Sequence, residues 1–217
     1  QRQMCIRDRV MQLASEMGRL YDIEKLTFFR ACECYEELEA AGKLDADALI
    51  FVNSIASVSL SDEDWASYCE AHSAILPKLV VEITEEEEMN ERELERKRNV
   101  PGSSGVFALD DYGSGYSNGN SLLTIAPKYV KVDIAIIRGI DTDADKQQFL
   151  MTLIDYAHPR GVQVLAEGVE TLSELRKVLE MGVDLLQGYC LARPAAEPLA
   201  IHERAVRVIE EAARQRD

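Results

Sequence analysis

The sequence contains no apolar run close to the roughly 18 residues that a membrane-spanning helix requires. It also lacks the hydrophobic stretch of a secretory signal, so we expect a cytoplasmic protein. Basic residues are few relative to acidic ones: 24 lysines and arginines against 39 aspartates and glutamates, for a net charge of −15. Because nucleic-acid polymers and anionic membranes bind basic surfaces, neither is an expected partner. An anionic small substrate stays compatible, since bound metal ions can invert the local charge.

Cysteine is uncommon, and the five cysteines form no C-x-x-C pair. An odd number without such a pair is typical of free thiols in a reducing compartment. The three histidines, His72, His158 and His202, fall in or beside predicted helices, so a zinc site is not expected. The loop Gly113-Ser114-Gly115 lacks the further glycine and the lysine of a P-loop, and no dinucleotide-binding fingerprint occurs.

The sequence does contain a regular alternation of apolar segments and helical patterns, with no internal repeat or low-complexity linker. Its 217 residues, 47% of them hydrophobic, suffice for one large domain with a substantial core. The apolar segments predict six strands, at residues 49–53, 79–85, 106–109, 129–133, 162–167 and 183–186. Helices are predicted at residues 10–20, 23–41, 61–74, 86–98, 145–157, 171–182 and 198–214. This alternation is typical of a parallel sheet with helical crossovers.

Two segments of the chain are unusual in their charge. Residues 1–9 have no apolar period and carry three arginines in an acidic protein, and they resemble translated sequencing-adapter read-through. We expect them to be a non-native or disordered leader before a domain at residues 10–217; the alternative is a frayed basic turn. The second segment, 86–98, is acidic early and basic late, as suits a helix dipole, and is expected to be a solvated helix face.

A polar residue stands at the end of every predicted strand. These residues are Asn53, Glu82, Asp110, Asp133, Glu167 and Gln187. Parallel strands bring their carboxyl ends to one rim, and in a β/α barrel the catalytic groups come from several of these ends. The sequence therefore predicts an α/β fold, a TIM-type β/α barrel with about six of its eight strands. For the segment ending at Asp110, the alternative is an Asp-rich turn in which that residue caps a helix.

The oxygen-bearing side chains at this rim favour a hard cation. Asn53, Glu82, Asp110 and Asp111 offer amide and carboxylate oxygens, which suit Mg²⁺ or Mn²⁺. Two such ions are the usual device for hydrolysing a phosphoester, because they activate water and hold both reacting oxygens.

Two further rim residues are candidates for the chemistry itself. The alternation of the strand at 129–133 puts Lys131 on the same face as Asp133, where its ammonium would orient the nucleophile or stabilise phosphate charge. Glu167 is the best-placed remaining carboxylate to take a proton from water.

Taken in order, the motifs at these strand ends resemble those of the EAL domain, the family of bacterial cyclic di-GMP phosphodiesterases. The similar segments are Val52-Asn53, Glu82-Ile83-Thr84-Glu85, Asp110-Asp111-Tyr112-Gly113-Ser114-Gly115, Lys131-Val132-Asp133, Glu167-Gly168-Val169-Glu170 and Gln187-Gly188-Tyr189. The resemblance runs from about residue 10 to residue 194. It implies a modified TIM barrel that hydrolyses cyclic di-GMP to linear pGpG with two Mg²⁺ or Mn²⁺ ions.

The resemblance also implies a role for each motif residue. The implied metal ligands are Asn53, Glu82, Asp110 and Asp111. The residues implied to handle the catalytic water are Lys131 and Glu167, the latter also touching metal. Those implied to hold the loop from Asp111 to Ser117 are Glu85 and Glu170. The substrate site would be lined by Asp133 and Gln187.

One departure from the family is large, because the Glu-Ala-Leu strand and the strand before it are absent. We therefore expect an EAL-type domain without its first two strands, inactive as given. Two alternatives are a cyclic di-GMP sensor that does not cleave its ligand and a β/α-barrel phosphodiesterase for another ester. A homodimer, and a fused sensory or nucleotide-cyclase-type domain in the parent protein, are compatible with the resemblance.

Overall fold

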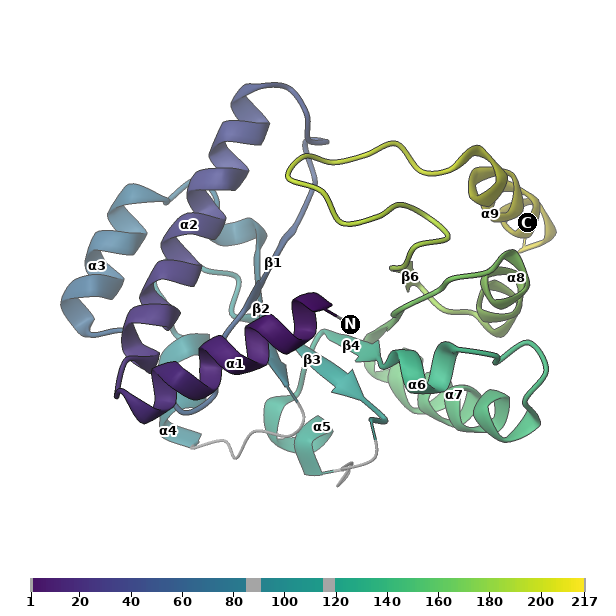
Figure 1. Cartoon of the computed structure of the whole chain (residues 1–217), viewed down its shortest axis with the longest axis horizontal. Coiled ribbons are helices and arrows are strands. Elements are labelled where there is room, and N and C mark those ends of the chain that lie inside the picture. The colour runs from purple at the N-terminus through teal and green to yellow at the C-terminus, as the bar shows by residue number, and fades with distance from the viewer. Residues whose placement is uncertain (1, 85–90, 115–119, 217) are drawn as a thin grey trace. The chain divides into compact units, whose positions relative to one another are not determined.

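The structure is a computed structural model that describes residues 2–84, 91–114 and 120–216. It divides into two compact units, the first made of Gln1–Ile83 and Glu87–Val106 and the second of Thr84–Glu86 and Phe107–Asp217. In Figure 1 the first unit runs from purple to teal and the second from teal to yellow. Helices and strands alternate along both units, and every strand pairing described within a unit is parallel.

The first unit carries two neighbouring strands and the helices that pack on them. Its elements are α1 (Arg2–Glu16), α2 (Leu20–Ala40), β1 (Ile50–Asn53), α3 (Asp62–Ala71), η1 (Leu76–Lys78), β2 (Leu79–Thr84) and α4 (Glu91–Arg98). The β1–β2 register places Asn53 opposite Glu82, so two of the predicted rim residues meet at neighbouring strand ends.

Aromatic residues join α2 to α3 in the core of this unit. Phe28 of α2 lies edge-on to Trp65 and Tyr68 of α3, with ring centroids 5.4 and 5.7 Å away. All three side chains are buried, and the two helices run side by side in Figure 1. Ser61 caps α3 by accepting a hydrogen bond from the Asp64 amide, as the Ser-Asp-Glu-Asp pattern predicts.

The second unit carries four parallel strands in chain order, β3 beside β4, β4 beside β5 and β5 beside β6. Its elements are β3 (Val106–Tyr112), α5 (Asn120–Ile125), β4 (Tyr129–Val132), α6 (Ile134–Ile137), α7 (Ala144–Ala157), η2 (His158–Arg160), β5 (Gln163–Ala166), α8 (Leu172–Met181), β6 (Leu185–Leu186) and α9 (Glu203–Arg216). The buried core joins the strands to the inner faces of α7, α8 and α9 through Val130, Val164, Leu150, Leu175 and Val208.

All six strands lie within two residues of their predicted positions except at the carboxyl end of β3, which continues through Asp110 and Asp111 to Tyr112. The Asp-rich turn is therefore the wrong alternative. Short α5 and α6 were not predicted, because a helix of four to six residues has too few turns to show a period. The first helix begins at Arg2, before residue 10, and the last begins at Glu203, after residue 198.

The prediction of a solvated face at 86–98 is wrong for part of α4. Lys97 is 2% exposed and Leu94 is also buried, so this charged helix turns one side into the first unit. Hydrophobic periodicity counts lysine as a surface residue, so it does not reveal Lys97, which is buried because it is paired in the interior. Among the described residues, no helix is both long and apolar enough to span a membrane.

Candidate functional site

A buried lysine joins two carboxylates at the carboxyl ends of neighbouring strands in the second unit. The Nζ atom of Lys131, in β4, lies 2.7 Å from Asp110 Oδ1 and 2.8 Å from Glu167 Oε1. The side chains of Lys131 and Asp110 are 7% exposed and that of Glu167 is 15% exposed. Charges this far from solvent are costly unless paired, so the ion pairs fix all three side chains.

Asp111 joins this cluster because the backbone of β3 is irregular there. Successive strand residues normally point to opposite faces, which would separate the Asp110 and Asp111 side chains. The β3–β4 register shifts between Leu109 and Tyr112, and Asp111 has a positive φ of 57°. Such a bulge redirects a side chain. Carboxylate oxygens of Asp110, Asp111 and Glu167 consequently all lie within 4.8 Å of one another.

The donor set of this cluster fits a hard divalent cation. Three carboxylates and one ammonium leave two negative charges when all are ionised. Carboxylate oxygens of the kind that Asp110, Asp111 and Glu167 offer are the ligands that Mg²⁺ and Mn²⁺ take in proteins.

The environment raises the pKa of Glu167 to about 7 from an ordinary value of 4.5. Burial is the largest cause, because it disfavours the charged carboxylate; the Lys131 ammonium works in the opposite direction, and Asp110 and Asp111 add to the rise. A carboxyl group with a pKa near 7 exchanges protons readily at neutral pH, which suits a general base.

Gly168 holds Glu167 at the end of β5. Its φ is 64°, and a Cβ atom there would lie 2.4 Å from two side-chain atoms of Ile134. The backbone amide of Glu167 also donates to the Val132 carbonyl at 3.1 Å, which ties it to β4. No larger residue fits at position 168 without displacing Ile134 of α6.

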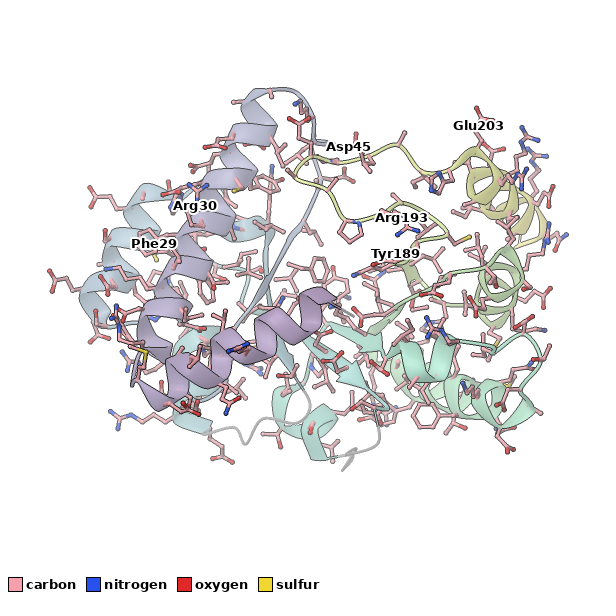
Figure 2. All side chains as sticks on the ribbon, viewed as in Figure 1. Phe29, Arg30, Asp45, Tyr189, Arg193 and Glu203 are labelled. Carbon is pink, nitrogen blue, oxygen red and sulfur yellow. The ribbon has the colours of Figure 1, made fainter. Side chains whose placement is uncertain are left out.

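The segment after β6 is bound to the same region of the second unit. The Gln187 carbonyl accepts from the Val169 amide at 3.0 Å, and the Val169 carbonyl accepts from the Cys190 amide at 2.9 Å. A Cβ atom on Gly188 would lie 2.3 Å from the Val169 backbone, so these two backbones touch. Beyond them the Arg193 guanidinium stacks 4.6 Å from the centroid of the exposed Tyr189 ring (Figure 2).

The first unit brings together the other two predicted metal ligands. Asn53 and Glu82 are register partners at the ends of β1 and β2, and Glu82 is 5% exposed. The Ser54 amide donates to the Glu82 carbonyl at 2.9 Å and closes the strand pair at this end. A metal site that combines Asn53 and Glu82 with Asp110 and Asp111 stays a prediction.

The remaining predicted residues have varied surroundings. Asp133 caps α6, its Oδ1 accepting from the Ala135 amide at 2.8 Å, and Gln187 is exposed. Glu170 pairs with Arg138 at 2.6 Å on the surface of the second unit. Glu85 lies outside the described residues. The substrate and loop roles that the resemblance gives these four stay predictions.

Sequence reasoning missed two buried charged residues of the first unit, Glu24 of α2 and Lys97 of α4, which form an ion pair. Glu24 carries one signal, since it lies four and eight residues before Phe28 and Cys32, on the buried face of α2; Lys97 carries none, because nearly every residue of α4 is charged. It also missed a cavity of about 680 Å³ between α3 and α4, which none of the predicted site residues line. A smaller cavity of about 340 Å³ is lined by Asn53, Ser54 and Glu24 among others.

This chain is similar in sequence to a family of known proteins. The model of the EAL domain family matches residues 1–194. The cyclic di-GMP phosphodiesterase NbdA of Pseudomonas aeruginosa is 30% identical over 207 residues, which are 92% of this chain and 26% of NbdA. The probable cyclic di-GMP phosphodiesterase PdeG of Escherichia coli is 32% identical over 118 residues, 54% of this chain and 23% of PdeG. The chain thus spans about a quarter of these curated relatives.

Solved structures share the fold. One is a standalone EAL protein from Vibrio cholerae O395 in its c-di-GMP-bound form, with a TM-score of 0.74 at 23% identity. The match covers 90% of this chain and 84% of the Vibrio cholerae chain. The Klebsiella pneumoniae BlrP1 manganese/cy-diGMP complex has a TM-score of 0.69 at 24% identity, with 81% of this chain and 45% of that one covered. The predicted fold, an incomplete TIM-type β/α barrel with about six of its eight strands, is thereby confirmed. With 194 of its 217 residues matched by the family model, this chain belongs to the EAL domain family.

Proposed function

We propose that this chain supplies the metal-dependent site of a phosphodiesterase that hydrolyses cyclic di-GMP to linear pGpG. The observation that carries the proposal is Lys131 bridging Asp110 and Glu167, with Asp111 within reach of the same point. The substrate is inferred from the family and from relatives that are named cyclic di-GMP phosphodiesterases. The net acidity of the cluster alone would repel a phosphodiester, which is the reason to propose bound cations.

In this proposal, two Mg²⁺ or Mn²⁺ ions are held by Asn53, Glu82, Asp110 and Asp111, and when bound they supply charge neutralisation and a more acidic water. Glu167 accepts the proton of the attacking water, because burial raises its pKa and makes it a stronger base than an exposed carboxylate. The water oxygen bonds to phosphorus as the bond from phosphorus to the ribose oxygen breaks, and the leaving ribose oxygen keeps the electron pair and takes a proton from water. Lys131 holds Glu167 in place through the 2.8 Å ion pair and offsets negative charge on the phosphate.

A sensor that binds cyclic di-GMP without cleaving it is the second candidate. It is favoured by one observation: the Glu-Ala-Leu motif that names the family does not occur in the 217 residues. The resemblance implies that this motif supplies a further metal-ligating carboxylate. Without it the site is less able to hold two ions rigidly, and catalytic groups that act together are lost together. We propose that hydrolysis requires this motif and that the 217 residues alone bind more readily than they cleave.

The experiment compares three proteins for production of linear pGpG from cyclic di-GMP with excess Mn²⁺. These are the 217-residue chain, the chain preceded by a Glu-Ala-Leu segment from a relative, and the extended chain with Glu167→Gln. We expect activity in the second alone. Glu180→Gln in the extended chain is the matched control, because it makes the same chemical change at the exposed end of α8. An extended protein that binds cyclic di-GMP without producing pGpG would favour the sensor.

A further inference from the structure

The first unit contains a buried ion pair that the chemistry described so far does not use. Glu24 of α2 is 1% exposed and Lys97 of α4 is 2% exposed, and the Lys97 ammonium donates to Glu24 Oε1. Two interior charges lose their hydration, and apolar residues of similar volume are often as stable or more so. A pair at this depth is thus poorly explained by stability alone.

The pair is attached to the chain immediately after β1. Ser54 Oγ donates to Glu24 Oε1 at 2.6 Å and accepts from Lys97 Nζ at 2.6 Å, while the Ile55 amide donates to Glu24 Oε2 at 2.8 Å. Ser54 and Ile55 are themselves buried. Glu24 of α2 and Lys97 of α4 therefore hold Ser54 and Ile55 in place through charge-assisted hydrogen bonds, which are stronger than neutral ones.

Ser54 and Ile55 directly follow Asn53, one of the proposed metal ligands. The Ser54 amide also donates to the Glu82 carbonyl at 2.9 Å, and Glu82 is the register partner of Asn53. Glu24, Ser54 and Asn53 line one cavity of about 340 Å³, so the network reaches the space beside that ligand. A displacement of Ser54 would therefore move Asn53, which precedes it in the chain, and would disturb the hydrogen bond to the Glu82 carbonyl.

We propose that Glu24 and Lys97 are positioning residues that hold Asn53 and Glu82 in the geometry required to bind a divalent cation. This inference rests on the proposed function, since it takes Asn53 and Glu82 as metal ligands. Partners of this kind act by orienting the residues that touch the metal, and removing them commonly weakens metal affinity by about 10- to 100-fold. Glu24 supplies the acceptors for Ser54 and Ile55, and Lys97 holds Glu24 in place.

The test is Mn²⁺ affinity of the full 217-residue chain, followed by the electron paramagnetic resonance signal of free Mn²⁺. Glu24→Leu with Lys97→Met removes the hydrogen-bond acceptors and leaves the net charge unchanged, so no long-range charge effect enters. We expect affinity to fall by about 10- to 100-fold. Glu24→Gln with Lys97→Met also leaves the net charge unchanged but keeps an amide oxygen for Ser54 or Ile55. We expect that variant to retain affinity within about threefold of the unaltered chain.

Two more variants separate positioning from loss of folding. Phe28→Leu disturbs the aromatic core one turn further along α2 and should lower the melting temperature with no change in Mn²⁺ affinity. If the protein with Glu24→Leu and Lys97→Met does not fold, Glu24→Asp takes its place. It keeps the charge for Lys97 but withdraws the carboxylate by one methylene, and should weaken Mn²⁺ binding at least tenfold.

Glu82→Gln tells this inference apart from the proposed function. Suppose that Glu82→Gln weakens Mn²⁺ binding while Glu24→Leu with Lys97→Met, or Glu24→Asp, binds Mn²⁺ as tightly as the unaltered chain. Then the positioning role is wrong and the metal site stands. Weakening that tracks melting temperature across all variants, Phe28→Leu included, would also overturn positioning. If the unaltered chain binds no Mn²⁺, or Glu82→Gln binds it equally well, the metal site itself is wrong and the positioning role falls with it.

Discussion

Lys131 and Glu167 form a 2.8 Å ion pair, yet the pKa of the Glu167 carboxyl is raised to about 7. A lysine at this distance ordinarily lowers a carboxyl pKa, but burial of Glu167 and the nearby Asp110 and Asp111 outweigh it. The result is a carboxyl group that changes charge near neutral pH while a lysine holds its position. Because the two residues come from neighbouring strand ends, the sheet itself fixes their separation.

The first prediction follows from that raised pKa. In the folded chain Glu167 keeps its proton to about pH 7, whereas in the unfolded chain it loses it near 4.5. The folded state therefore binds more protons between these values, and stability falls as pH rises through this window, by about 3 kcal/mol in total. Metal-free Glu167→Gln, measured by urea unfolding from pH 5 to 8, should lose this dependence. Parallel pH profiles for the two proteins would contradict the assignment.

Removing the lysine leaves its partners uncompensated. Lys131→Met places the Asp110 and Glu167 carboxylates side by side in the interior without their shared cation, which should destabilise the metal-free protein at pH 8 by about 3–5 kcal/mol. Added Mn²⁺ should restore more stability to this variant than to the unaltered chain. Equal stabilisation of both by Mn²⁺, measured by thermal melting, would show that the ion binds elsewhere. Lys128→Met, at an exposed lysine immediately before β4, is the control.

The positive φ of Asp111 predicts an asymmetry between substitutions. Asn tolerates this backbone conformation at least as well as Asp, whereas a β-branched residue does not. Asp111→Asn should therefore leave the metal-free stability nearly unchanged, and Asp111→Val should lower it by about 1–2 kcal/mol. Both should weaken Mn²⁺ binding, because both remove a carboxylate from the cluster. Equal stability of the two variants in urea would argue against the bulge at this position.

Gly168 allows a prediction about crowding. A methyl group there would meet Ile134, so Gly168→Ala should cost about 1–3 kcal/mol through overpacking and its left-handed φ. Adding Ile134→Ala should recover part of this loss, because it removes the contact but not the backbone strain. Double-mutant analysis of unfolding free energies measures the coupling. Strict additivity of the two changes would mean that residues 168 and 134 do not touch.

The sequence was a good guide to the strands and a weaker one to the site. Apolar runs followed by a polar residue located all six strands, and the side chains of Lys131 and Glu167, from the neighbouring ends of β4 and β5, form an ion pair. The bulge that turns Asp111 toward Asp110 was not predictable, since it depends on how β3 pairs with β4.

Buried charge was the other feature that sequence patterns missed. Lys97 lies in a helix whose composition indicates a solvated surface, and its burial depends on Glu24, which is distant in sequence. Pairing between remote residues leaves no local period. The short helix α6, capped by Asp133, was missed for a related reason, because its single turn follows from how the chain leaves β4.

The most direct test of the metal-dependent site is Mn²⁺ anomalous scattering from crystals of this chain grown with the ion. We expect a peak with oxygen atoms of Glu82 and Asp110 and the Asn53 amide at about 2.0–2.6 Å from one ion. Asp110→Asn crystals should show a weaker peak or none. A structure in which Glu82 and Asp110 contact no common ion, although Mn²⁺ is bound elsewhere, would contradict the account.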